Sequence, residues 1–320
     1  MSEAVAEASP ILDPRKFKDP DFTADGTRRA EVALDGLTTL WFNTGTLCNL
    51  TCRNCYIESS PTNDQLVYIT AGEVDAYLDE IAADGLPTKE IGFTGGEPFM
   101  NPDLIPMLES VLSRGFQALV LTNAMRPMMK CATGLLSLKD KYGDRLVIRV
   151  SVDHYTQTLH EVERGPNSWK PLLTGLDWLA TNGFNLRLAG RSCWGEAEDH
   201  ARAGYERFLA EHGYPVDASD PEALVIFPEM DERLDVPEIT EQCWGILGVA
   251  PESIMCATSR MIVKRKGEDR PVVLPCTLLP YGEEFEMGHT LADAADAVKL
   301  NHPHCARFCV LGGGSCSKAG

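Results

Sequence analysis

The stretch Cys48-Asn49-Leu50-Thr51-Cys52-Arg53-Asn54-Cys55 has the spacing C-x3-C-x2-C and follows a strand-like run at residues 39–43. Three thiolates this close in sequence can surround one cuboidal iron–sulfur cluster if the backbone loops around it. Three ligands for four irons leave one iron open to a further ligand. A zinc site usually has four ligands, often in C-x2-C pairs, and no obvious fourth ligand lies nearby. The spacing therefore favours a [4Fe-4S] cluster with an open iron over zinc and over inert thiols.

Composition and charge narrow the class of protein around this loop. The chain has 320 residues, of which 44% are hydrophobic and 24% charged, as in ordinary globular proteins. Its net charge of -18 argues against a nucleic-acid or anionic-membrane partner. No segment approaches the roughly 18 unbroken apolar residues of a membrane span, and the acidic start lacks a signal core, which predicts a cytoplasmic protein. In a reducing compartment, eleven cysteines indicate metal binding or chemistry rather than disulfides.

Outward from the cysteine loop, short apolar runs alternate with segments of helical periodicity. Strands are expected at residues 39–43, 90–93, 118–121, 146–150, 185–188 and 224–227, with helices at 71–84, 102–114, 169–181 and 198–211 and a helical stretch reaching about residue 142. This alternation predicts parallel β/α units with right-handed crossovers. Periodicity alone leaves a closed eight-fold barrel, a partial barrel and an open sheet as alternatives.

The extent of this strand–helix alternation divides the chain into three parts. Residues 1–37 are polar and are interpreted as an N-terminal extension or poorly ordered arm. Residues 38–230 carry the β/α pattern, and residues 231–320 form a tail that is short on helix pattern and rich in cysteine. In the tail, the basic run at residues 261–266 is interpreted as a solvated strand edge.

Polar residues follow several of the expected strands. Thr94-Gly95-Gly96-Glu97-Pro98 comes after the second strand, and two glycines there permit close backbone contact while a carboxylate suits a cationic amine. Asn123, Ser151 and Asp153 end the third and fourth strands, and Arg187 and Arg191 lie at the end of the fifth. Because α/β folds bind ligands at the carboxyl ends of parallel strands, these residues are candidates for one binding site.

The cysteine spacing after the first strand and Gly95-Gly96-Glu97-Pro98 after the second resemble the signatures of the radical S-adenosylmethionine (SAM) superfamily over about residues 38–230. The resemblance implies an α/β fold with a partial (β/α)6 barrel. It also implies that Cys48, Cys52 and Cys55 hold a [4Fe-4S] cluster whose open iron chelates SAM. One electron then cleaves SAM to methionine and a 5′-deoxyadenosyl radical, which abstracts hydrogen from a substrate.

The resemblance further implies roles for the residues at the strand ends. Gly95 and Gly96 approach the methionine part of SAM, and Glu97 receives its ammonium group. The other implied SAM contacts, to ribose and carboxylate, are Asn123, Ser151, Asp153 and Arg191, with Arg187 as an alternative to Arg191. Many family members have an aromatic residue just before the third cysteine, but this chain has Asn54 there. The adenine contact is therefore predicted to pass to Tyr56 or to backbone.

The tail from residue 240 holds six of the eleven cysteines. Two strand-like runs around a turn at residues 266–269 predict a hairpin that brings Cys256 and Cys276 together. With the pair Cys305 and Cys309, this layout resembles Twitch, the shortened SPASM extension of some radical SAM enzymes, which implies a small Cys-rich domain with an auxiliary [4Fe-4S] cluster. Cys316 is a surplus candidate ligand. A structural zinc and free thiols remain alternatives, and Cys131, Cys193 and Cys243 are expected to be isolated thiols.

Together, the resemblance and these residues predict a radical SAM enzyme of oxidoreductase or transferase type, supplied with electrons by a flavodoxin- or ferredoxin-type donor. No catalytic side chain is assigned. A small-molecule substrate, undergoing dehydrogenation or bond formation, is favoured because no peptide-binding domain precedes residue 38. A maturase of a ribosomally made peptide is the alternative. A non-catalytic Fe-S or zinc-binding regulator is the alternative of another class, and Glu97 argues against it because a scaffold needs no amine-binding carboxylate.

Overall fold

The computed structural model describes residues 11–228 and 230–315, so the prediction for Cys316 lies outside the described residues. Its main sheet has eight strands in the order β7-β6-β5-β4-β3-β2-β8-β9. The strands are β2 (Thr39–Asn43), β3 (Glu90–Thr94), β4 (Gln117–Thr122), β5 (Leu146–Ser151), β6 (Asn185–Arg191), β7 (Leu224–Phe227), β8 (Ser259–Val263) and β9 (Val272–Leu274). A second, two-stranded sheet pairs β1 (Glu31–Val32) with β10 (Val298–Lys299) in antiparallel fashion.

Helices connect the strands of the main sheet. They are α1 (Ala71–Asp84), α2 (Leu104–Ser113), α3 (Arg126–Lys130), α4 (Ala132–Tyr142), α5 (Gln157–Arg164), α6 (Trp169–Thr181), α7 (Glu198–His212) and α8 (Cys243–Leu247). Short 3-10 turns lie at Pro98–Met100, Gly143–Arg145, Pro251–Ser253, Met255–Ala257, Glu283–Phe285 and Asp293–Ala295, and Cys305–Leu311 forms a π-helix, η7.

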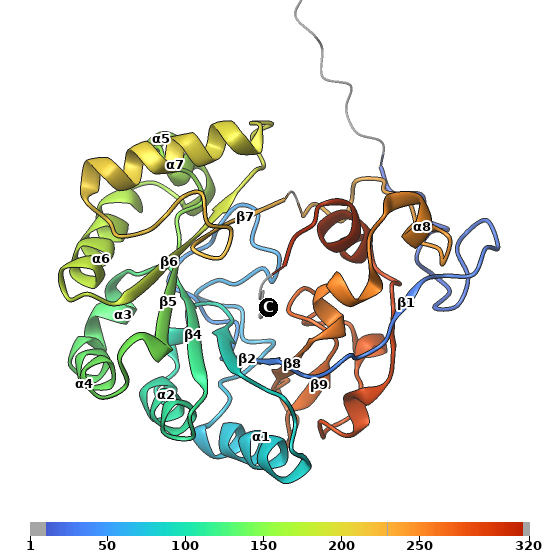
Figure 1. Cartoon of the computed structure of the whole chain (residues 1–320), viewed down its shortest axis with the longest axis horizontal. Coiled ribbons are helices and arrows are strands. Elements are labelled where there is room, and N and C mark those ends of the chain that lie inside the picture. Colours follow the sequence, from blue (N-terminus) through green and yellow to red (C-terminus); the bar gives the residue numbers. More distant parts are fainter. Residues whose placement is uncertain (1–10, 229, 316–320) are drawn as a thin grey trace, which may run out of the picture.

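The six strands expected from the sequence are β2 to β7, and each pairs in parallel with its neighbour. Figure 1 shows the sheet curving around a central space with α1, α2, α4 and α6 on its outer side. Strands β7 and β9 stand at the two ends of the strand order, so the sheet is not closed. The α/β fold with a parallel barrel-like sheet is confirmed, and it is a partial barrel.

The strands are apolar throughout because both of their faces are buried. On the outer face, Leu40 and Phe42 of β2 pack with the residues that helices α1 and α2 turn inward. On the inner face, Trp41 packs with Leu119 of β4 and with residues of the C-terminal region. Parallel strands covered on both sides lose the polar alternation of half-exposed strands, which explains their continuous hydrophobic runs.

Helix α1 illustrates how local sequence sets an element. Thr70 caps its start, accepting a hydrogen bond from the backbone N–H of Glu73 while the Glu73 side chain accepts from the backbone N–H of Thr70. Gly85 ends it in the left-handed conformation with φ of 61°, which glycine adopts at little cost. Between these signals the buried side chains recur at helical spacing. The sequence pattern predicted the same bounds.

The C-terminal region extends the sheet of the barrel. The expected hairpin is formed by β8 and β9, which pair in antiparallel fashion, and β8 also pairs in parallel with β2. All five residues of β8 are buried, so the interpretation of residues 261–266 as a solvated edge was wrong for Met261–Val263. A strand between two neighbours has no solvated edge, and the sequence does not reveal that β2 lacks another partner on that side.

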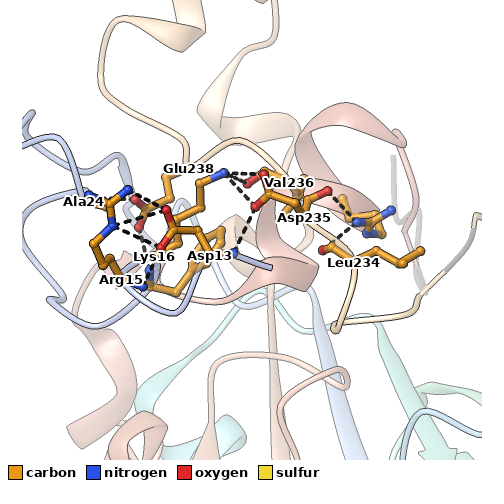
Figure 2. Close-up of polar contacts among 10 residues, drawn as sticks. Asp13, Arg15, Lys16, Ala24, Leu234, Asp235, Val236 and Glu238 are labelled. Atoms are coloured by element: carbon orange, nitrogen blue, oxygen red, sulfur yellow. Dashed lines mark hydrogen bonds and ion pairs between the residues drawn. The ribbon is translucent and has the colours of Figure 1, made fainter. Parts of the chain in front are cut away.

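Residues 11–37 lie along the C-terminal region. Figure 2 shows Asp13 and Lys16 meeting Asp235, and the Lys16 ammonium lies 2.8 Å from the Asp235 carboxylate. Glu238 accepts from the backbone N–H groups of Phe17 and Ala24 and forms a buried ion pair with Arg29 at 2.7 Å. This part of the predicted arm is therefore packed onto the segment that follows residue 230. Among the described residues, no helix combines the length and apolar character needed to cross a bilayer.

Candidate functional site

The carboxyl ends of β3 to β7 and the cysteine loop surround one cavity. Of the residues predicted to contact the cluster or SAM, ten line it: Cys48, Cys52, Cys55, Tyr56, Gly95, Gly96, Asn123, Ser151, Asp153 and Arg191. They come from segments up to 143 positions apart, counted from Cys48 to Arg191. The cavity places them together because parallel strands present all their carboxyl ends on one side of the sheet.

Backbone N–H groups and burial set the environment of the loop cysteines. The backbone N–H groups of Leu50 and Ser59 each lie 3.4 Å from the Sγ atoms of Cys48 and Cys55, respectively. Burial raises the pKa of the Cys48 thiol to about 12 and that of Cys52 to about 11, so a bound cation is needed to hold them as thiolates near neutral pH.

A zinc ion and an iron–sulfur cluster require different spacings of their sulfur ligands. A tetrahedral zinc holds its sulfurs about 3.8 Å apart, given Zn–S bonds of about 2.3 Å. In the described part of the chain, Glu232, His302 and His304 bring three potential metal-ligand atoms within 4.8 Å of one another. The three loop cysteines do not form such a group among the described residues.

Glu97 lies behind the cavity wall. Its Oε1 accepts from the Thr122 hydroxyl at 2.8 Å and from the Phe99 N–H at 3.2 Å, and its Oε2 accepts from the Asn123 N–H at 2.9 Å. Burial raises its pKa to about 6 against these hydrogen bonds. The carboxylate thus ties the end of β3 to the end of β4, next to the place where the resemblance implies an ammonium contact.

The two glycines before Glu97 are required by backbone packing. A Cβ atom at Gly96 would lie 2.2 Å from the carbonyl oxygen of Leu47, and one at Gly95 would lie 2.5 Å from that of Gly45. Gly96 N–H donates to Gly45 O at 2.8 Å. The glycines therefore seat the β3 loop directly on the start of the cysteine loop, in addition to leaving the cavity open beside them.

Arg191, at the end of β6, presents unused donors. Its Nη1 donates to the carbonyl oxygen of Asn54 at 2.7 Å and lies 3.3 Å from Glu163 Oε1. Its Nε and Nη2 are buried and have no hydrogen-bond partner among the described residues. Buried donors without partners are costly, so this side of the guanidinium suits an anionic ligand such as a carboxylate. Arg187 lies elsewhere, 4.0 Å from Glu222.

Asp153 is paired with Arg164, the last residue of α5, at 2.5 Å. Burial opposes the charge of Asp153, but Arg164 outweighs it and lowers the Asp153 pKa. Burial also opposes the charge of Arg164, while Asp153 and the thiols of Cys52 and Cys48 raise its pKa. A cation that interacts with two cluster thiols offsets the negative charge that a thiolate-bound cluster brings into the site.

The tail cysteines also gather. Cys256, Cys276, Cys305 and Cys309 are buried in one hydrophobic cluster, the last two on helix η7. Arg260 interacts electrostatically with Cys256 and Cys276, and Cys256 with Cys305. Burial raises the pKa of Cys305 to about 12 and that of Cys256 to about 11. The structure therefore places the four predicted auxiliary ligands in one region, and Cys131, Cys193 and Cys243 outside that buried set.

The tail also forms one wall of the cavity. Phe308, beside Cys309, and Leu278, two residues after Cys276, line the cavity with Phe227 and Met230. The rings of Phe227 and Phe308 lie 5.6 Å apart. The Tyr281 hydroxyl donates to the carbonyl oxygen of Ile57 at 2.6 Å, so the tail holds the cysteine loop directly. This part of the cavity lining is apolar.

The group Glu232, His302 and His304 is a hydrogen-bonded network. Nε2 of His302 lies 3.4 Å from the Glu232 carboxylate, and Nδ1 of His302 accepts from the His304 backbone N–H at 3.1 Å. Both ring nitrogens of His302 are thus used, which leaves no lone pair for a metal ion in this arrangement. The network instead braces the start of η7.

Fold and cavity define an α/β partial barrel with a cavity between the strand ends and a loop of three cysteines. The Radical SAM superfamily model matches residues 42–190, the part of the chain that carries this loop, strands β3 to β5 and most of β6. The match supports a radical SAM superfamily enzyme, and that superfamily implies a [4Fe-4S] cluster and SAM.

Individual relatives agree with this assignment. The antilisterial bacteriocin subtilosin biosynthesis protein AlbA of Bacillus subtilis (strain 168) is 29% identical over 276 residues, covering 80% of this chain and 58% of AlbA. The AdoMet-dependent heme synthase of Oleidesulfovibrio alaskensis is 25% identical over 142 residues, covering 44% of this chain and 34% of the synthase. The chain thus spans less than two thirds of the length of either relative.

Solved structures show the same fold. Streptococcus suis SuiB bound to its precursor peptide SuiA superposes with a TM-score of 0.59 at 13% identity, covering 82% of this chain and 66% of SuiB. The enzyme anSMEcpe with bound AdoMet gives a TM-score of 0.55 at 12% identity, covering 80% of this chain and 76% of anSMEcpe.

Several residues of the site were not found from the sequence. Glu163, Arg164 and Tyr281 contact the cysteine loop or its thiols, and Phe227, Leu278 and Phe308 line the apolar wall. Glu163 and Arg164 stand directly before Gly165 at the end of a helix, and that position gives no sign that they face Asn54 and Asp153. Only the charges in an otherwise buried turn could have drawn attention to them.

Proposed function

We propose that the chain reductively cleaves SAM at a [4Fe-4S] cluster held by Cys48, Cys52 and Cys55 and uses the resulting 5′-deoxyadenosyl radical to abstract hydrogen from a substrate. The observation that carries the proposal is the convergence of ten predicted residues on one cavity. When bound, cluster and SAM supply the radical chemistry; the protein orients SAM and excludes water. Arg191 offers two buried donor groups to the SAM carboxylate, and Tyr56 lines the cavity as the adenine contact.

The proposal extends to the substrate side of the cavity. The apolar wall of Phe227, Met230, Leu278 and Phe308 suits an apolar or neutral group of the substrate next to SAM. The similarity to AlbA favours a ribosomally made peptide over the small molecule that the sequence alone favoured. An auxiliary cluster at Cys256, Cys276, Cys305 and Cys309 would stand directly behind this wall, a position suited to exchanging an electron with a substrate radical.

An anaerobic assay tests the reaction. The purified chain, reconstituted with iron and sulfide and given SAM and dithionite, should form 5′-deoxyadenosine, and the triple variant Cys48→Ala/Cys52→Ala/Cys55→Ala should form none. Absence of product from a wild type with an intact cluster would instead support a non-catalytic iron–sulfur regulator. Iron counting of the triple variant tests the auxiliary cluster, since about four irons should persist.

Substrate class needs a separate measurement. Co-expression with candidate precursor peptides encoded nearby, followed by intact-mass spectrometry, should reveal a mass change that depends on Cys48. A peptide that stays unchanged while a small metabolite is consumed would restore the small-molecule alternative.

A further inference from the structure

The last turn of α5 contacts both the cysteine loop and Arg191, the cavity-lining residue that ends β6. Glu163 lies there with only 2% of its surface exposed. Its Oε1 accepts from the Asn54 backbone N–H at 2.9 Å, and its Oε2 accepts from the Asn54 side-chain amide at 2.8 Å. Its own carbonyl oxygen accepts from the Arg53 N–H at 2.8 Å. Glu163 therefore holds the segment between Cys52 and Cys55 through three hydrogen bonds.

The same carboxylate holds Arg191. Nη1 of Arg191 lies 3.3 Å from Glu163 Oε1 and donates to Asn54 O at 2.7 Å, which uses both of its N–H groups. A guanidinium has five N–H groups in a fixed plane. The three that remain, on Nε and Nη2, are buried and have no partner among the described residues. Fixing Nη1 therefore decides the direction in which the other edge of the guanidinium points.

The edge formed by Nε and Nη2 has the geometry that takes a carboxylate through two parallel hydrogen bonds. Because Arg191 lines the cavity beside the cysteine loop, its free edge can grip a carboxylate chelated near the cluster. Because Glu163 and Asn54 already hold Nη1, the arginine is preorganised before the ligand arrives, which avoids the cost of ordering a long side chain on binding.

We infer that Glu163 is a positioning residue, which sets Arg191 for the carboxylate of SAM and locks it to the cysteine loop. The inference rests on the proposed function. It assigns to this chain a coupling between the loop and the SAM-binding arginine, so that disturbing Glu163 weakens SAM binding through Arg191.

The test replaces one oxygen acceptor by a donor. Glu163→Gln puts an N–H₂ group against either Arg191 or Asn54, both of which donate. The matched control is Glu161→Gln, the same change on the same helix, where the carboxylate contacts Gln157 and the Trp169 N–H instead. SAM binding is followed by the change that SAM causes in the electron paramagnetic resonance spectrum of the reduced cluster, and turnover by 5′-deoxyadenosine formation.

We expect Glu163→Gln to raise the half-saturating SAM concentration about tenfold, the contribution of roughly one charge-assisted hydrogen bond, with a larger effect on KM than on kcat. Glu161→Gln should match the wild type. In a double-mutant cycle, Glu163→Gln/Arg191→Gln should bind SAM no more weakly than Arg191→Gln alone, because Glu163 acts through Arg191.

Unchanged or tighter SAM binding by Glu163→Gln overturns the inference. Additive effects of Glu163→Gln and Arg191→Gln in the cycle also overturn it, because they show that Glu163 acts independently of Arg191. If Glu163→Gln does not fold by circular dichroism, the cycle is run with Glu163→Asp, which keeps the charge and shortens the reach. A wild type that binds no SAM and makes no 5′-deoxyadenosine refutes the proposed function itself, so the two failures are distinguishable.

Discussion

Gly96 is a residue at which the fold depends directly on the absence of a side chain. A Cβ atom there would meet the backbone of Leu47 at 2.2 Å, and backbone atoms cannot rotate away. We expect Gly96→Ala to push the β3 loop off the cysteine loop, lowering the free energy of unfolding by about 1–3 kcal/mol and reducing the iron bound at that loop.

Urea unfolding and iron analysis measure both effects of Gly96→Ala. Gly72→Ala is the control, since Gly72 is exposed in the first turn of α1 and a Cβ atom there meets nothing within 4 Å. That variant should be neutral or slightly more stable, by up to about 1 kcal/mol, because alanine favours helix. Equal behaviour of the two variants would contradict the packing argument.

His160, on α5, makes stability depend on pH. Its ring is fully buried against Trp169, and neither nitrogen has a partner among the described residues. Burial, assisted by Arg164, lowers its pKa to about 4. Since the folded state prefers the neutral ring, stability is lost as the pH falls from about 6.5 towards 4, by about 2 kcal/mol between pH 7 and pH 5.

The change that tests this is His160→Phe, which keeps an aromatic ring and removes the titrating nitrogens. Its free energy of unfolding should fall less between pH 7 and pH 5 than that of the wild type, and at pH 7 it should be no less stable. Parallel pH profiles for His160→Phe and wild type would rule out this source of acid sensitivity.

At the scale of elements, helix α1 shows how much of the barrel is built from local signals. Thr70→Ala removes the side-chain acceptor of the capping box while leaving the core untouched, so we expect a loss of about 1 kcal/mol in the free energy of unfolding. Thr174→Ala, at an exposed position inside α6, removes a hydroxyl of the same kind without a cap and should be neutral or slightly stabilising. Denaturant melts compare them, and equal losses would remove the special role of the cap.

The elements whose positions the local sequence predicts least well are those of the tail. The hairpin of β8 and β9 was predicted from its turn, but its place beside β2 was not. Strand pairing between residues 39–42 and 259–262 depends on which edge of the barrel is left without a partner, and no local pattern carries that information.

At the scale of the whole molecule, Glu238 joins the N-terminal segment to the tail. Glu238→Ala leaves Arg29 buried without its counter-ion, and we expect it to cost about 3–5 kcal/mol and to free residues 11–37 for proteolysis. Glu241→Ala breaks the exposed pair with Arg28 and should cost at most about 1 kcal/mol. Limited proteolysis with mass spectrometry and thermal melts distinguish the two, and similar cleavage patterns would show that the Glu238 ion pair does not hold the segment.

The amino-acid sequence by itself determined the β/α rhythm, the three-cysteine loop and the strand-end residues, because these depend on periodicity and on short spacings along the chain. Only the tertiary structure decided which distant groups meet. Glu163 reaches Asn54 across 109 positions, and Arg29 reaches Glu238 across 209. Such contacts follow from the packing of whole elements, in which the orientation of each side chain is set by all its neighbours, so the residues that position the site could not be read from local sequence.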